Sequence, residues 1–192
     1  MKKLIVLSSA AWLLVALLAA AERAGLGVKL AAVALPFKAA MLYAAPPDAV
    51  LSVPVEGVRA ARIKSSWHAP RAGGRLHEGQ DIFAARGTAV RSATAGYVVR
   101  VGENALGGNT VYVLGAGGRT YYYAHLDAYA PDASVGSYVT PGTVLGYVGT
   151  TGNAAGTSPH LHFGVYTSAG AIDPLPLLSD DAPSHDAAPE AN

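Results

Sequence analysis

Residues 159–164 read PHLHFG and place two histidines, His160 and His162, on either side of a single leucine. Alternate side chains of a β-strand point to the same face, so these imidazoles would lie ~6.6 Å apart along the chain on one side of a sheet. That spacing suits one metal ligand and one catalytic base. Two ordinary strand histidines would give the same pattern, so the motif depends on the rest of the chain for its meaning.

Two further short motifs contain a histidine: HEGQD, which runs from His77 to Asp81, and YAHL, which contains His125. Catalytic zinc needs three protein ligands and an open fourth position for water. We expect His77, Asp81 and His162 to supply the three ligands. His125 and His160 would then share the roles of general base and donor to the tetrahedral intermediate.

A rival interpretation places HEGQD on a helix as a variant of the HExxH zinc-protease motif, with Glu78 as general base. The neighbouring residues argue against a helix, because two glycines come shortly before the motif and Gly79 interrupts it. The apolar residues after Asp81 also continue as a strand. We therefore expect Glu78 to be a solvated side chain.

The composition limits the classes of function that remain. The chain has 192 residues, a formal net charge of +1 and mixed basic and acidic residues, so nucleic acid is not expected as a partner. It contains no cysteine, which excludes thiolate metal sites, disulfides and a lipid-modified N-terminal cysteine. A zinc site in this protein must use nitrogen and oxygen ligands only.

The N-terminus has the pattern of an export segment, because two lysines precede an uncharged stretch from Leu4 to Ala21. As a helix this stretch would be ~27 Å long, close to the thickness of a bilayer's hydrocarbon core. Residues 1–21 are thus either a retained membrane anchor or a signal peptide cut after Ala21, and both place the following domain in the cell envelope or outside the cell. Residues 22–50 contain charged residues and Pro36, which favours a juxtamembrane or linker segment over a second crossing.

After Pro46-Pro47-Asp48 the chain changes to short Val, Ile, Thr and Tyr runs separated by glycines, which predicts an all-β domain over residues 51–178. A hairpin turn is expected at Gly115-Ala116-Gly117-Gly118. Residues 179–192 are rich in Pro, Ala and acid, which predicts a disordered tail. The predicted runs are 81–84, 89–101, 110–114, 120–125, 143–148 and 160–166.

The three motifs, in this order, resemble those of the lysostaphin-type zinc endopeptidases of bacterial cell walls. The resemblance extends from about Val53 to Pro174. It implies a small antiparallel β-sheet or sandwich-like core with loops that wall a groove, one Zn²⁺ per chain, and cleavage of peptide cross-links in peptidoglycan. It also implies the same ligands, His77, Asp81 and His162, and the same catalytic pair, His125 and His160.

The chain departs from the family at two positions near the motifs. Many relatives have glutamate where this chain has Gly164, and often glycine where it has His68. Neither change touches a predicted ligand, so the metal chemistry is expected to persist while substrate fit stays open. Three alternatives remain: cross-links of Gly-Gly or D-Ala–diamino acid type, an exported protein as substrate, and a non-catalytic regulator or peptidoglycan-binding module.

Overall fold

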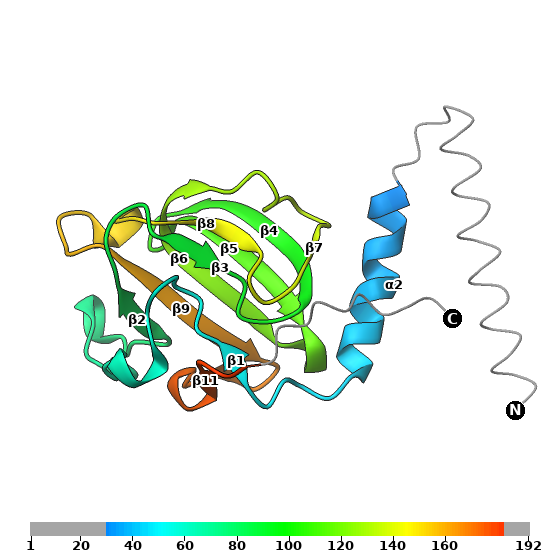
Figure 1. Ribbon diagram of the computed structural model, residues 1–192, viewed down its shortest axis with the longest axis horizontal. Helices are drawn as coiled ribbons and strands as arrows, with labels where there is room; N and C mark the ends of the chain where they lie inside the picture. The colour runs from blue at the N-terminus through cyan, green and yellow to red at the C-terminus, as the bar shows by residue number, and fades with distance from the viewer. Residues whose placement is uncertain (1–29, 183–192) are drawn as a thin grey trace, which may run out of the picture. The chain divides into compact units, whose positions relative to one another are not determined.

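The computed structural model describes residues 30–182 (Figure 1). The chain divides into two compact units, residues 1–41 and 42–192. The described elements are α2 (Leu30–Ala44), β1 (Leu51–Ser52), β2 (Gln80–Phe83), β3 (Ala89–Arg91), β4 (Gly96–Asn104), β5 (Gly108–Gly115), β6 (Thr120–Tyr129), β7 (Tyr138–Val139), β8 (Val144–Val148), β9 (His160–Thr167), β10 (Gly170–Ile172) and β11 (Leu178–Ser179). Short 3₁₀ turns cover Ala60–Arg62, Ala72–Gly74, Ala116–Gly118, Gly152–Ala154 and Leu175–Leu177.

The helix α2 occupies part of the segment predicted as a linker, and it contains Pro36. Within residues 30–182, no helix combines the length and the apolar character needed to cross a bilayer. The predicted signal peptide or anchor over residues 1–21 lies outside the described residues.

Nine strands of the described chain form one antiparallel sheet, with the order β10-β9-β6-β5-β4-β7 along its main path. Outside this path, β2 pairs with β9, and β8 pairs with both β3 and β6. β5 and β6 are joined by the turn expected at residues 115–118. Figure 1 shows β4, β5, β6 and β9 side by side, with β2 next to β9. The prediction of an all-β, antiparallel domain is confirmed.

The strand β6 changes its partner part-way along its length. Its first half, up to Ala124, pairs with β9, and its second half, from Leu126, pairs with β8. His125 is the residue at the change, and it has a φ of 63°. Because few non-glycine residues adopt this left-handed conformation, His125 marks a local break in the regular strand.

The two faces of β9 have different environments. Leu161, Phe163 and Val165 are fully buried in the apolar core, together with Tyr121 and Tyr123 of β6. The residues that alternate with them, His160 and His162, point to the opposite face. The period-2 pattern of the sequence therefore predicted correctly that the two histidines share one face.

The edges of the folded domain differ from the prediction. β1 and β11 form a parallel two-stranded sheet in which Ser52 pairs with Ser179, and Asp180 accepts a hydrogen bond from the Ala60 N–H. The predicted boundary after Leu178 thus falls inside a strand. At the N-terminal boundary, Asp48 lies three residues before the predicted start of the domain. It nevertheless contacts Thr94 and accepts a hydrogen bond from Arg119.

Candidate active site

Three side chains that the sequence analysis singled out as metal ligands converge on one point. The Nε2 atom of His77 lies 2.8 Å from Nδ1 of His162 and 3.0 Å from Oδ1 of Asp81. Nδ1 of His162 lies 3.2 Å from the same carboxylate oxygen. Of the groups in the described part of the chain, these three are the set whose ligand atoms all fall within 4.8 Å of one another.

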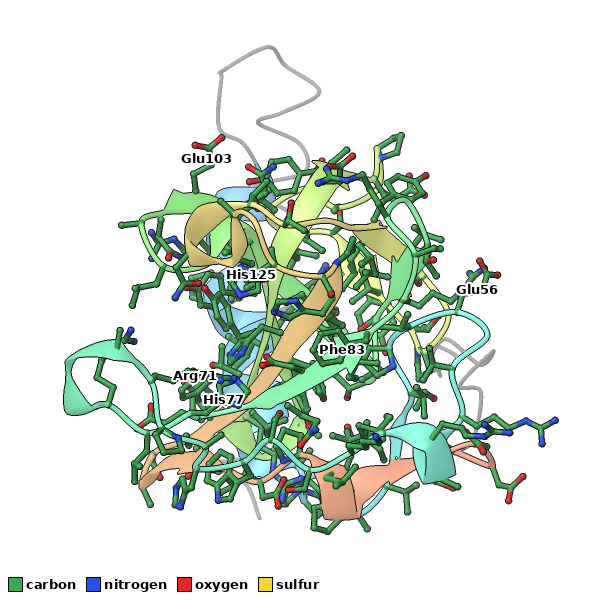
Figure 2. The ribbon with its side chains drawn as sticks, turned by 90° about the vertical axis from the view of Figure 1, so that its left-hand side faces the viewer. Glu56, Arg71, His77, Phe83, Glu103 and His125 are labelled. Atoms are coloured by element: carbon green, nitrogen blue, oxygen red, sulfur yellow. The ribbon has the colours of Figure 1, made fainter. Side chains whose placement is uncertain are left out.

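The pairing of β2 with β9 places these residues. In the antiparallel register, Asp81 lies opposite His162, and Phe83 lies opposite His160. Side chains that are directly opposite point to the same face and lie close together. Figure 2 shows His77, Phe83 and His125 gathered around the middle of this face, whereas Glu56 and Glu103 lie at its margins.

Gly79 leaves room for the ring of His162. A Cβ atom at position 79 would lie 2.6 Å from Cε1 and 2.7 Å from Nε2 of His162, and 2.8 Å from the backbone oxygen of Phe163. Real Cβ atoms do not approach other atoms so closely, so any other residue would push the imidazole or the strand aside. The glycine inside HEGQD thus allows the imidazole of His162, an expected metal ligand, to take its observed position.

Gly79→Ala is therefore expected to weaken zinc binding by about 10- to 100-fold, because it displaces a ligand ring without removing it. The measurement is a titration of zinc against a chromophoric chelator. The control is Gly136→Ala, at a loop position where a Cβ would contact nothing but φ is 93°. That control lowers stability by ~1 kcal/mol without changing zinc affinity. Equal zinc affinity for the Gly79→Ala and wild-type proteins would refute the steric role.

Three of the four clustered histidines are oriented by backbone carbonyls. The Nδ1 atoms of His77, His125 and His160 lie 2.7 Å, 2.9 Å and 2.8 Å from carbonyl oxygens of Ser66, Thr151 and Ser158. A carbonyl can only accept, so each Nδ1 carries the proton and donates it. The neutral ring then has its lone pair on Nε2, which is the form needed by a metal ligand and by a general base.

His125 and His160 lie next to His77, Asp81 and His162. Their ring centres are 5.0 Å apart, the His125 ring is 5.9 Å from that of His162, and Nε2 of His160 is 3.9 Å from Oδ1 of Asp81. Both side chains are buried. Burial is the main reason that the pKa of His125 falls to about 4, so this imidazole is neutral near pH 7.

Arg71 is a residue of the site that the sequence analysis missed. Its Nη2 donates to Oδ2 of Asp81 at 2.5 Å, while the other oxygen, Oδ1, faces His77 and His162. Burial opposes ionisation of Asp81, but the close imidazoles of His162 and His77 outweigh it and hold the pKa of this carboxyl below its usual range. A small hairpin brings Arg71 back to the site, since Pro70 bridges to Leu76. The glycines between them were a turn signal that pointed to this return.

The contact predicts that Arg71 positions the carboxylate. Arg71→Ala is expected to weaken zinc binding by ~10-fold, with partial recovery in Arg71→Lys, because lysine keeps the charge but not the rigid donor geometry. The control is Arg75→Ala, since the side chain of this neighbouring arginine donates to the backbone oxygen of Ala72 and makes no other hydrogen bond or ion pair within residues 30–182. Zinc competition titrations compare the variants, and an equal loss in Arg71→Ala and Arg75→Ala would exclude a specific role.

The rival helical interpretation of HEGQD does not fit the structure. Residues 77–79 are not helical, residues 80–83 form β2, and Glu78 is exposed.

The structure also shows what surrounds the two positions, 164 and 68, at which the chain departs from the family. A Cβ at Gly164 would lie 2.8 Å from the Tyr166 ring, and His68 has the φ of 56° that glycine adopts easily.

The donor set fits a zinc ion. It consists of two imidazole nitrogens and one carboxylate oxygen, which is a combination found in catalytic sites that keep a position for water. Asp81 is held as an anion, and the Nδ1–H bond of His77 leaves its Nε2 lone pair directed at the cluster. One ion per chain is the number that three such ligands hold.

Comparison with known proteins assigns the chain to a family. Residues 75–174 match peptidase family M23. The chain belongs to this family. The M23 chain is 38% identical over 126 residues to L-Ala–D-Glu endopeptidase of Bacillus subtilis, an alignment that covers 60% of this chain and 39% of the relative. The chain thus spans well under two thirds of the length of that relative.

Two solved structures support the same fold. The catalytic domain of lysostaphin from Staphylococcus simulans is 31% identical, with a TM-score of 0.54. The match covers 61% of this chain and 92% of the lysostaphin domain. A zinc-containing peptidase from Vibrio cholerae is 28% identical, with a TM-score of 0.55, and covers 64% of this chain and 38% of that one. The suspected lysostaphin-type family is therefore confirmed.

Proposed function

We propose that the protein is a zinc-dependent endopeptidase of the cell envelope that hydrolyses peptide cross-links in peptidoglycan. The observation that carries this proposal is the convergence of His77, Asp81 and His162 beside two further histidines whose Nδ1 atoms are held by backbone carbonyls. A structural metal site has no need of the two extra histidines, whereas amide hydrolysis needs a base and a donor.

The proposed division of labour follows from the geometry. Zinc, when bound, would polarise the scissile carbonyl and lower the pKa of water. His160 is the proposed base because its Nε2 lies nearer the ligand cluster, 3.9 Å from Asp81 Oδ1. His125, whose Nε2 is unprotonated at rest, would take up the proton that His160 removes from the water and pass it on, stabilising the developing oxyanion and protonating the leaving amine. The hydrogen bonds from Nδ1 to Thr151 and Ser158 would keep both rings aligned during these steps.

The family relationship supports the same substrate class. The name of the Bacillus subtilis relative describes a peptidase for a bond between L-Ala and D-Glu, and lysostaphin is described as an antimicrobial peptidase. A purely regulatory role is less well supported, because all three ligands and both additional histidines are present.

The test is mass spectrometry of products released when the zinc-loaded full-length protein is incubated with intact cross-linked peptidoglycan. Cleavage of a peptide bond by the wild type, absent with His160→Ala, is the expected result. Muropeptides, a glycine-rich peptide and a denatured protein are compared in parallel. Intact peptidoglycan with both proteins, despite bound zinc, would reject the proposal in favour of a regulator, and cleavage of the denatured protein alone would indicate a protein substrate.

A further inference from the structure

A pocket of about 760 Å³ opens beside the metal-ligand cluster. Asp81 and Phe83 of β2 line one side of it, and the segment from Gly57 to Lys64 lines the other. Its volume is in the range of pockets that hold a small ligand. Because Asp81 also belongs to the ligand cluster, any group in this pocket would lie next to the reacting bond.

The pocket is basic. Arg59, Arg62 and Lys64 all line it, and their side chains are exposed. None of the three forms an ion pair with any other residue in the described range 30–182, whereas Arg71, Arg86 and Arg91 each pair with an acid. Asp81 is the one acidic residue in the lining, and its carboxylate is already held by Arg71 and the two histidines. The pocket thus presents uncompensated positive charge.

The neighbouring strand offers a surface for an extended chain. Among the described strands β2 pairs with β9 alone. On its other edge the Asp81 N–H donates to Ser66 Oγ, and Ile82 and Phe83 beyond it border the pocket. A strand edge that has no strand partner is a common binding site for an extended peptide. Phe83 adds an apolar contact, since its side chain is 61% exposed and its ring lies 5.2 Å from that of His160. An aromatic ring left so exposed beside a catalytic residue is typical of a binding surface.

We propose that this pocket is a substrate subsite that binds a carboxylate-bearing residue of the peptide next to the scissile bond. The inference rests on the proposed peptidase function and narrows its substrate. Arg62 and Lys64 attract the carboxylate, and the Phe83 ring packs against the peptide. A glycine bridge offers no side-chain carboxylate to these cations, so the subsite favours stem peptides that carry free acid groups.

A binding experiment tests the subsite without turnover. Two synthetic muropeptides, identical except that the glutamate carboxylate is free in one and an amide in the other, are titrated into zinc-loaded full-length His160→Ala protein. The free acid is expected to bind about 10-fold more tightly at low salt, and the difference should shrink as salt rises. Adding Arg62→Gln and Lys64→Gln to that protein should bring the two affinities together. Arg59 is left unchanged because it also borders a second pocket that contains Asp180 and Asp181.

A substitution outside the pocket controls for the loss of a surface cation. Arg100→Gln removes a cation that lies over the Tyr112 ring, outside both pockets, and should preserve the preference for the free acid. Equal binding of the two muropeptides, or an equal loss of preference in Arg100→Gln, overturns the subsite. A preference that survives while the wild type releases nothing from peptidoglycan would instead support the subsite and reject the proposed catalytic function.

Discussion

Asp81→Asn is expected to lower zinc affinity by more than ~100-fold and to abolish hydrolysis. Asp81 supplies the one anionic donor of the three-residue cluster, and its Oδ1 lies 3.0 Å and 3.2 Å from the other two donors. An amide has no charge and is a poorer zinc ligand. It would also leave the Arg71 guanidinium without its anionic partner. Bound metal is measured by elemental analysis after dialysis.

A second readout separates lost metal from lost folding. Because zinc binds only the folded state, it should raise the Tm of the wild type relative to the chelator-treated protein, and this shift should vanish in Asp81→Asn. Glu78→Gln is the control within the same HEGQD motif. Its side chain is exposed, so zinc content, the Tm shift and activity should stay at wild-type levels. If Glu78→Gln bound zinc but lost activity, the general base would be Glu78 and the assignment of His160 would be wrong.

Part of the candidate site was predictable because the residues expected as metal ligands occupy short motifs with local geometric meaning. HLHF has the period of a strand, and the strand places His160 and His162 on one face. The contact between that strand and HEGQD could not be predicted from local pattern, because residues 81 and 162 are distant in the sequence and only the β2–β9 register brings them together. In the sequence analysis this convergence depended on the chemistry of zinc and on the family resemblance.

The residues that orient the site were much harder to predict. The carbonyls of Ser66, Thr151 and Ser158 act through the backbone, so their side chains leave no signature in the sequence. The β1–β11 pair was missed for a related reason, since two-residue strands carry no periodicity. Such features depend on contacts between distant segments, which composition and spacing do not report.

The change of partner along β6 leads to the second large effect. His125 occupies the break between the halves that pair with β9 and β8, where its φ of 63° directs the ring toward His160 and His162. Alanine at this position would confound lost chemistry with backbone strain. Asparagine tolerates the left-handed region, so His125→Asn removes the imidazole while the backbone can stay in place.

His125→Asn is expected to lower kcat by ~10²- to 10⁴-fold while zinc remains bound, since a proton donor is lost but no ligand is. The matched control is His68→Asn, because His68 is the other non-glycine residue of the described chain with positive φ, and its exposed ring stacks on Trp67. Steady-state kinetics on muropeptides and zinc analysis are applied to both variants. A large loss of kcat in His125→Asn alone, with full zinc content in both, assigns the effect to the imidazole at the break in β6. Loss of zinc in His125→Asn would show instead that the break in β6 supports the ligands, and His160 would then be left as the sole candidate for proton transfer.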